Sequence, residues 1–534
     1  SKFNTEKVED MSYMFQGARV LKVLDVTNFV TSRVTDMSFM FSNLDNVKSL
    51  DVSKFDTSNV RDFSSMFQLM RSLTSLDVSK FDTSKAADMS YMFQSLMFVK
   101  ELDISKFDTN NVEDMYSMFS GCSSLNSLDL SHFKTSKVKD MCYMFWNCQK
   151  ITSLDLSSFD TSNVRDMAYM FENCEKLIEI KGLNKFNTQY VSDMGGMFNY
   201  CRNLKSIDLS SFSVQRVENM ASMFSHTAGL QSLDLSKFVT TNVKTMELMF
   251  DSSSVEKIDL NSFDTRNVEN MANMFSGVKL KSIDLSNFDT TKVNNVESMF
   301  YNAVNLEKIQ FSNKFKCSKC VNMENLFAQC ESLESLDITS FDTSRVTNMR
   351  SMFRGMKKLT SLELSNLDIG NVKDMAYWFY GCQSLVQLDV SKLVGTNVLT
   401  MQNAFDGCSS LKFLDFSNFG GKNVQSWYKT FQGCFSLTSL VLTNLETSNT
   451  EYFNGMFAKC DNLKKIDVSS FDTKKATDMK AMFSNCKSVT SLDVSNFVTK
   501  NVDSFESMFE NCEQLKYLDV SKFEGTNTIS ISYM

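Results

Sequence analysis

One pattern of about 26 residues runs through the chain from end to end, and this repeat is the strongest constraint on its fold. An apolar residue followed by Asp-Val, Asp-Leu or a close variant recurs twenty times between Leu24 and Leu518, at spacings of 25, 26 or 27 residues. The idealised unit reads LxxLDVSxFDTSxVxDMxxMFxxC. Self-similarity at such a period predicts a solenoid, in which each unit is one coil that stacks only on its neighbours.

The apolar columns of this repeat indicate where the core lies. The phenylalanines of the FDT and MF elements account for 38 of the 47 phenylalanines, and most of the 35 methionines fall in the VxDM and MF elements. A surface rich in Met and Phe can bind ligands or soft metals. Fixed columns favour a stacked core instead, because one isolated unit buries too few side chains to offset the entropy of ordering it.

The LxxLDVS element alternates apolar and polar residues, which predicts a short strand. Leu50 and Val52 would point inward, and Asp51 and Ser53 would point to the outer face. We expect this strand to pair in parallel with its copies in the neighbouring units. The complete absence of proline fits such a ladder, since average usage would give about 27 prolines and each would break a ladder hydrogen bond.

The rest of the unit reads as a corner followed by a compact segment. The Thr and Ser hydroxyls of FDTSNV can bond to nearby backbone N–H groups, as turn residues do. Val60, Phe63, Met66 and Phe67 follow the spacing i, i+3, i+6, i+7, which suits a helical turn. We therefore predict one parallel sheet along one face and short helical (3₁₀ or α) or irregular segments along the other.

Composition adds limits on domain number and partners. We find no linker, so we expect residues 1–534 to form a single continuous solenoid. The net charge of −8, without a Lys/Arg block, disfavours nucleic acid as a partner. No apolar run reaches the ~20 residues of a membrane span. The opening SKFNTEKVEDM is neither a signal peptide nor an initiator Met, which suggests a mature, trimmed or partial product.

The unit resembles the 25–26-residue repeat of bacterial surface lipoproteins and the BspA-like leucine-rich repeats. The matching pieces are SSMF at 64–67, SMFSGCSSLNSLDL at 117–130 and AMFSNCKSVTSLDV at 481–494, and the resemblance covers essentially the whole chain. It implies a leucine-rich-repeat-like solenoid exposed on a cell surface or outside the cell, used in adhesion or in binding host or matrix components. It supplies no catalytic residues.

An acidic column is the main candidate site. The second position of the LDV element is acidic in 17 of 20 units, and the exceptions are Lys181, Gln310 and Val441. Alongside Asp25 and Glu363, the candidate binding residues are Asp51, Asp77, Asp103, Asp129, Asp155, Asp208, Asp234, Asp259, Asp284, Asp337, Asp389, Asp415, Asp467, Asp493 and Asp519. Carboxylates on adjacent parallel strands, ~4.8 Å apart, repel by ~0.9 kcal/mol in water, which invites basic partners or nearby lysines such as Lys54 and Lys80.

Several interpretations of this column stay open. A solvated acidic face that prevents aggregation is the plainest, and a protein- or glycan-binding face is the functional one. A Ca²⁺ site is disfavoured, because one Asp per coil does not supply the 6–8 oxygens that this ion prefers. We expect no cofactor and no metal.

The cysteines follow the core columns. Eleven of the 14 stand three residues after the MF phenylalanine, among them Cys122, Cys148 and Cys174. Neighbouring copies would lie within disulfide range, so a disulfide ladder is an alternative in an oxidising compartment. We favour buried free thiols. Cys317 and Cys320 form a CxxC, but no second pair accompanies it, so repeat drift is a better interpretation than zinc.

Catalytic chemistry finds little support in the sequence. His132 and His226 are the only histidines, and G-x-S-x-G, P-loop and H-E-x-x-H motifs are absent. A threonine column from Thr57 onward could form an ice-binding lattice, but it stands at a predicted corner and breaks at Val214. We therefore predict a non-enzymatic protein that binds a protein or glycan through its Asp/Ser face. The alternative is a filament or coat component that assembles head to tail through uncapped solenoid ends.

Overall fold

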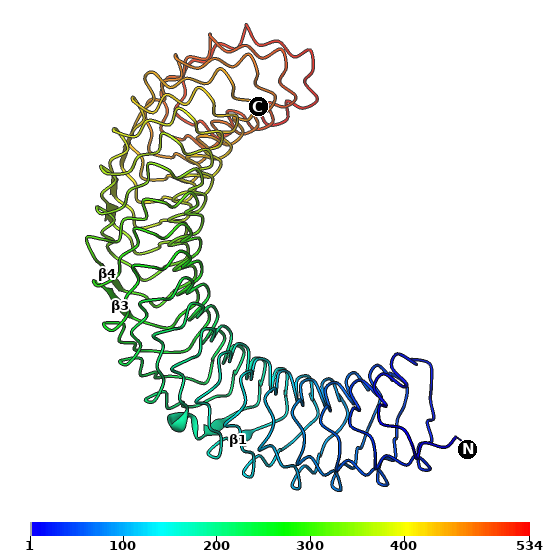
Figure 1. Cartoon of the computed structure of the whole chain (residues 1–534). Helices are drawn as coiled ribbons and strands as arrows, with labels where there is room; N and C mark the ends of the chain where they lie inside the picture. The colour runs from blue at the N-terminus through cyan, green and yellow to red at the C-terminus, as the bar shows by residue number, and fades with distance from the viewer. Residues whose placement is uncertain (1–2) are drawn as a thin grey trace. The chain divides into compact units, whose positions relative to one another are not determined.

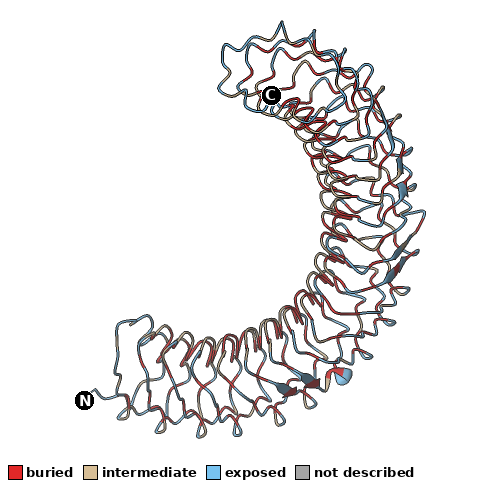
Figure 2. Ribbon diagram, turned by 180° about the vertical axis from the view of Figure 1, so that it is seen from behind, coloured by how far each residue is buried: buried red, intermediate tan, exposed pale blue. Residues whose placement is uncertain are grey.

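The computed structural model describes residues 3–534, and it shows a stack of coils with one coil per repeat (Figure 1). The chain forms two compact units, Ser1–Asn267 (unit 1) and Val268–Met534 (unit 2). Buried residues lie on the inside of the coils and exposed residues on the turns (Figure 2). The predicted parallel solenoid is therefore confirmed.

The LDV elements of neighbouring coils pair in parallel, but only at intervals. In unit 1, β1 (Ser153–Asp155) pairs with β2 (Glu179–Lys181), and the 3₁₀ helix η1 (Leu183–Lys185) follows. The pairs of unit 2 are β3 (Ser282–Leu285) with β4 (Lys308–Phe311), β5 (Ser361–Leu362) with β6 (Gln387–Leu388), and β7 (Phe413–Asp415) with β8 (Ser439–Val441). Each register joins residues 26 positions apart, so the predicted pairing is correct, although it forms four two-stranded sheets.

A second and more continuous ladder follows the VxDM and MF elements. The N–H of Phe63 donates to the carbonyl of Asp88 in the next coil at 3.0 Å, and residues 65, 67 and 69 donate in the same way to residues 90, 92 and 94. Parallel bridges join one coil to the next at the VxDM aspartate, from Asp10 to Asp193 and on to Thr245 in unit 1. This ladder holds the coils together along nearly all of unit 1.

The MF segment is not helical, although its spacing favoured a helical turn. Ser65 and Leu69 have φ values of +56° and +58°, and most other coils repeat left-handed residues at these two positions. Alternate N–H groups here bond to the next coil, and those between them bond three residues back, as Met66 N–H does to the carbonyl of Phe63, so the i→i−4 bonds of an α-helix do not form. The irregular alternative therefore holds here, and η1 is the only helix among residues 3–534.

The MF phenylalanines form the centre of the core. The rings of Phe67 and Phe93 stack with centroids 6.0 Å apart and an interplanar angle of 2°, and the Phe119–Phe145 and Phe145–Phe171 pairs are similar at 5.8 and 5.7 Å. In unit 2, the stack includes the Phe457–Phe483 pair at 5.6 Å. The four residues whose spacing predicted a buried face, Val60, Phe63, Met66 and Phe67, are fully buried. The core columns are therefore where the repeat placed them.

The threonine of the FDT corner bridges two coils with its hydroxyl. Thr109 Oγ1 donates to the carbonyl of Lys134 at 2.9 Å and accepts from the N–H of the same residue at 2.8 Å. Thr109 is 1% exposed, as are most members of this column. At the corner, the hydroxyl thus makes the two hydrogen bonds that a backbone N–H and carbonyl make elsewhere between coils. The ice-binding interpretation is therefore wrong, because these hydroxyls bond to the next coil and are not presented to solvent.

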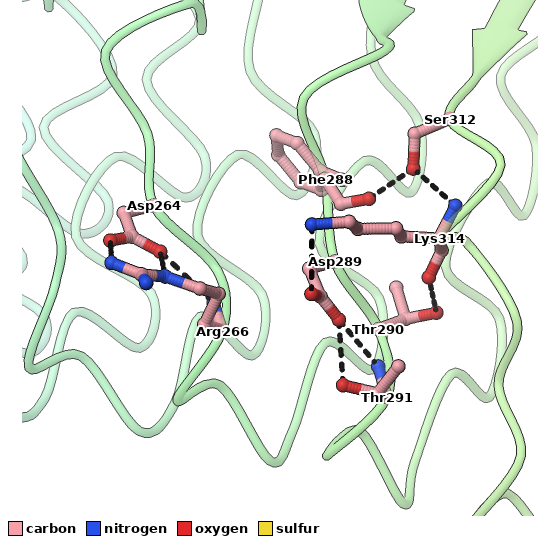
Figure 3. A network of polar contacts seen from close by, with 8 residues as sticks. All are labelled: Asp264, Arg266, Phe288, Asp289, Thr290, Thr291, Ser312 and Lys314. Atoms are coloured by element: carbon pink, nitrogen blue, oxygen red, sulfur yellow. Dashed lines mark hydrogen bonds and ion pairs between the residues drawn. The ribbon is translucent and has the colours of Figure 1, made fainter.

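The aspartate of the same corner closes a local turn. In unit 2, Asp289 Oδ1 accepts bonds from the N–H and hydroxyl of Thr291 at 3.1 and 2.7 Å, and Lys314 lies 3.9 Å from Oδ2 (Figure 3). In unit 1, the side chain of Asp264 pairs instead with Arg266, at 2.6 Å. In both corners the backbone N–H two positions on also donates to the carboxylate, which is an Asx turn and fixes the direction of the chain.

We expect Thr109→Val to destabilise its corner by about 1 kcal/mol, because Val is of similar size but removes the hydroxyl that pairs with the N–H and carbonyl of Lys134. Native-state hydrogen exchange should show faster exchange at the Lys134 amide and in the flanking coils. Thr109→Ser keeps the hydroxyl and serves as the matched control. Equal exchange rates in the Val and Ser variants would contradict the bridging role.

Candidate functional site

The aspartates of the LDV column form an outward-facing acidic face, as predicted. Of the fifteen candidate residues, thirteen are exposed, and Asp415 and Asp467 are half-buried. All but three coils contribute one carboxylate to the column, and the strand registers place successive positions of the column opposite one another, as Asp155 lies opposite Lys181. We call this surface the Asp face. Among residues 3–534, no three His, Cys, Asp or Glu side chains form a group that could hold a metal ion.

The sequence did not reveal what these carboxylates do locally. In every one of the fifteen, Oδ1 accepts a hydrogen bond from the backbone N–H two residues further on, at 2.8 to 3.1 Å. Asp51, for example, accepts from Ser53 at 3.0 Å. The Asp face is therefore built from Asx turns that start each LDV corner.

These hydrogen bonds also set the charge of the Asp face. The hydrogen bonds from the side chain and backbone of Ser53 lower the pKa of Asp51, and Lys54 lowers it further, while Asp25 opposes them. The same causes lower the pKa of Asp77, Asp103 and most other members of the column. Hydrogen bonds to the ionised form favour it. The Asp face is thus ionised at neutral pH despite its stacked carboxylates.

The three exceptions in the column coincide with the places where strand pairing is longest. Lys181, Gln310 and Val441 lie in β2, β4 and β8, opposite Asp155, Asp284 and Asp415. The remaining pair, β5 with β6, ends one residue before the acidic position. In the part of the chain that the structure describes, a strand pair therefore extends through the second position of the LDV element only where the second of the two coils has no acidic residue there.

Charge repulsion alone does not account for this pattern. Lys181 has an aspartate in the coil before it and another, Asp208, in the coil after it, yet it pairs only with the coil before. That pairing uses the Lys181 carbonyl, which accepts from the N–H of Leu156 at 2.9 Å. An Asx turn does not by itself prevent such a bond, because Asp88 of the VxDM element forms an Asx turn with Ser90 and its carbonyl still accepts from Phe63 N–H of the preceding coil.

One part of the Asp face is hollowed into a groove. In unit 2, a cavity of 590 Å³ runs across three coils at the aspartates 467, 493 and 519. Lys465, Lys516 and Tyr517 line it as well, and Tyr517 is 76% exposed. Lys465 Nζ lies 3.6 Å from Oδ2 of Asp467. Carboxylates, ammonium groups and an aromatic ring therefore meet in one accessible groove.

A second carboxylate column was not recognised from the sequence as a stacked acidic ladder. The VxDM aspartates of unit 1 lie directly above one another and are half-buried or exposed. The eight consecutive members are Asp10, Asp36, Asp62, Asp88, Asp114, Asp140, Asp166 and Asp193. They too form Asx turns, as from Cys142 N–H to Asp140 Oδ1 at 2.8 Å. The signal is present in the sequence, because the Asp of VxDM recurs at the period of the repeat.

The two columns differ in electrostatics because their burial differs. Burial is the main cause that raises the pKa of Asp140 to about 6, and the neighbouring carboxylates Asp166 and Asp114 contribute to the rise. The hydrogen bond from Cys142 N–H acts in the opposite direction and lowers the pKa. Burial likewise raises the pKa of Asp62. Further along, Asn219 and Asn295 occupy this column and make the same bond, for example from Ala221 N–H to Asn219 Oδ1 at 2.9 Å. An amide can therefore replace the acid without loss of the turn.

The cysteine column is internal. All 14 cysteines are free thiols; thirteen are buried, and Cys512 is half-buried. Cys122 Sγ donates to the carbonyl of Phe93 at 3.2 Å, and burial raises the pKa of Cys122 to about 12. Cys317 and Cys320 are fully buried in the Thr and Val columns, where the Cys317 N–H donates to Thr290 Oγ1 at 3.0 Å. Both belong to the core of their coil.

The histidines do not form catalytic arrangements. His132 Nε2 lies 3.0 Å from the carbonyl of Ile104. His226 stacks on Tyr200 and has Ser225 Oγ and Asp251 Oδ2 within 2.8 and 3.4 Å of its ring. Both of these oxygens approach the same nitrogen, Nδ1. A catalytic triad needs the hydroxyl and the carboxylate on opposite ring nitrogens, so this trio is not one.

We expect Asp140→Asn to raise the melting temperature at pH 7–8 and to leave it nearly unchanged at pH 4. A carboxyl whose pKa is higher in the folded state stabilises the fold fully below its unfolded pKa of about 4, and this contribution is lost as the pH rises through about 6. Melting curves between pH 4 and 8 measure the effect. Asp51→Asn is the control of opposite sign, because the pKa of Asp51 is lowered. A pH-independent shift for Asp140→Asn would contradict the assignment.

We expect a small thiol reagent to modify the native protein mainly at Cys512, and to modify all 14 cysteines after denaturation. The thiolate is the reactive form, and burial keeps the other cysteines protonated and covered. Mass spectrometry of the alkylated protein counts the modified sites. A count below 14 in denatured, unreduced protein would indicate disulfides and contradict the free-thiol column.

Comparison with known proteins places this solenoid in a family. Seven overlapping segments match a family described as "Mycoplasma protein of unknown function, DUF285": residues 1–100, 70–180, 176–284, 230–334, 278–392, 305–419 and 399–523. No curated protein matches the chain. No helix among residues 3–534 has the length and apolar character needed to cross a membrane.

Several solved bacterial structures are similar to the chain. A leucine-rich repeat protein from Bacteroides ovatus is 19% identical, with 72% of this chain and 85% of that chain covered and a TM-score of 0.29. One from Eubacterium ventriosum is 16% identical, with 66% and 86% covered and a TM-score of 0.32. A leucine rich cell surface protein from Faecalibacterium prausnitzii is 15% identical, with 70% and 77% covered and a TM-score of 0.25. The chain belongs to the DUF285 family, and the predicted relationship to bacterial BspA-like repeat proteins is confirmed.

Proposed function

We propose that the chain is a non-enzymatic repeat protein that acts at the cell surface or outside the cell and binds a partner through its Asp face. The observation that carries this proposal is the 590 Å³ groove at the aspartates 467, 493 and 519. Here the Asx-turn aspartates of three coils line one concave site together. Binding sites are generally concave, with a few polar groups that fix the orientation of the ligand.

The chemistry of the groove favours a basic protein segment over a neutral glycan. The Oδ1 atom of each aspartate accepts from the backbone, as Asp493 Oδ1 does from Ser495 N–H at 3.0 Å, and the carboxylates of Asp493 and Asp519 are exposed. Three such carboxylates in adjacent coils match a segment that bears several Arg or Lys side chains. Tyr517 adds an exposed ring on which a guanidinium can stack.

The groove can be tested with a fluorescent octa-arginine peptide. We expect the triple variant Asp467→Asn, Asp493→Asn, Asp519→Asn to weaken binding about tenfold, since exposed charge pairs contribute ~0.2–1 kcal/mol each. Asn keeps the Asx turn, as Asn219 does in the other column, so the fold should be unaffected. Fluorescence titration at low and moderate salt gives the affinities.

The matched control is the triple variant Asp103→Asn, Asp129→Asn, Asp155→Asn, which removes the same charge from the Asp face outside the groove. We expect it to change the affinity about twofold or less, because long-range charge effects are screened by salt. Equal losses in the two variants, or no loss in either, would contradict the groove as the binding site. Head-to-tail self-association stays a prediction, for which light scattering over a range of concentrations is the measurement.

A further inference from the structure

Unit 1 contains a second groove, on a different side of the coil from the Asp face and of opposite charge. This cavity of 810 Å³ is lined by residues on either side of the buried valine of the VxDM element. The side chains that matter here are Lys137, Lys139, Arg165, Arg216, Tyr190 and Glu113. They belong to neighbouring coils, so the basic groove runs along the direction in which the coils stack.

The groove gathers positive charge on a chain that is negative overall. Four cationic side chains and one carboxylate line it, whereas the whole chain carries a net charge of −8. Lys139 is paired with Glu113 at 2.6 Å, and both side chains stay more than half exposed. The side chain of Arg165 has no hydrogen-bond or ion-pair partner elsewhere in residues 3–534. Lys137 Nζ donates to the uncharged Asn111 Oδ1 at 2.7 Å, so the guanidinium of Arg165 is the cation most available to an anion, and Lys137 keeps an unpaired charge beside it.

An aromatic ring lies among these cations. The guanidinium carbon of Arg216 is 5.0 Å from the centroid of the Tyr190 ring, and Tyr190 is 44% exposed. The contact with Arg216 holds the ring in place while nearly half of the side chain remains open. With coils spaced about 4.8 Å apart, the groove from Lys137 to Arg216 extends about 14 Å along the stack.

The backbone beneath the groove is already bonded from coil to coil. The N–H of Lys139 donates to the carbonyl of Glu113, that of Arg165 to Lys139 and that of Ser192 to Arg165, each at 2.9 Å. A peptide that adds as a strand needs unpaired N–H and carbonyl groups along an edge. This groove offers long cationic side chains and a ring instead, so strand addition is not available to a partner.

We propose that this groove binds an anionic polysaccharide, with its carboxylate or sulfate groups on Lys137, Lys139, Arg165 and Arg216 and one sugar ring against Tyr190. A polyanion with regularly spaced charges matches cations presented at the regular spacing of the coils. A sugar ring presents C–H groups that suit an aromatic face. This site is independent of the acidic groove of the Asp face, which carries the opposite charge and lies in other coils.

A nucleic acid fits the groove less well. Sequence-independent binding of single strands uses several aromatic side chains as a stacking platform along a basic channel. Here Tyr190 is the one aromatic ring in the lining. Acidic peptides lack a ring that suits Tyr190 and have no backbone edge to use. The anionic polysaccharide is therefore the occupant that uses every feature of the site.

The experiment measures binding of heparin fragments, which carry sulfate, and of polygalacturonate, which carries only carboxylates, by calorimetry with the full chain. We expect at least one of them to bind, and neutral dextran not to bind. The double variant Lys137→Gln, Arg165→Gln should weaken binding about tenfold. Tyr190→Ala should weaken it severalfold. Glu113→Gln should tighten it, because it removes a carboxylate and releases Lys139 from its ion pair.

The matched control is Arg61→Gln, Lys85→Gln. Arg61 stands in the same column as Arg165 and Lys85 in the same column as Lys137, and both lie outside the groove. This pair removes equal charge, so it should change the affinity about twofold or less. All the substituted side chains except that of Tyr190 are long and exposed, and melting curves check that each variant is folded.

Four results would overturn the proposal. One is the absence of binding to both polysaccharides. Another is an equal loss in the groove variant and its control, which would indicate diffuse charge. A third is an affinity for poly-glutamate or for an oligo-dT strand equal to or above that for the polysaccharides. The last is unchanged binding for Tyr190→Ala. None of these results depends on the Asp face, so this test and that of the acidic groove can fail separately.

Discussion

The hydrogen bonds between coils are the interaction on which the rest of this structure depends. They join residues about 26 positions apart, as from Phe63 N–H to the carbonyl of Asp88, and so place each side chain beside its own equivalent. This arrangement favours residues that gain from contact with a copy of themselves. Phenylalanine does, as the stacked rings of Phe67 and Phe93 show. Threonine does as well, because one hydroxyl can donate to and accept from the same residue of the next coil.

The same arrangement brings carboxylates of neighbouring coils close together, where they repel one another, and the two carboxylate columns differ in how this repulsion is reduced. On the Asp face, exposure and the Asx turns keep Asp51 and its equivalents ionised, so their contribution to stability is present at neutral pH and is lost in acid. In the VxDM column, burial raises the pKa of Asp140, and its contribution is greatest in acid and declines towards neutral pH. Two columns of one residue type thus respond oppositely to pH, because one is solvated and the other is half-buried.

The sequence predicted the periodic features of the fold well. Repetition located the coils, the parallel pairing and the buried columns, because burial at a fixed register depends only on which residues recur. It did not predict the backbone of the MF segment, where the spacing of Val60, Phe63 and Met66 is compatible with a helix. The left-handed residues Ser65 and Leu69 decide that segment, and serine and leucine carry no signal for this conformation. The basic groove was also missed, because its cations are spread over several units and form no block in the sequence.

The columns that stay constant and those that vary therefore have different roles. Phe, Thr and the Asx-turn aspartates recur because each coil needs them to stack, so most of their chemistry is used within the fold. The residues on either side of the VxDM valine vary from coil to coil and face solvent, as Lys137, Tyr190 and Arg216 do. Only such columns can make one stretch of a regular solenoid differ from the next. Specific recognition in a protein of this kind is then a property of clusters across several coils, and these clusters become visible when the repeat is read by column.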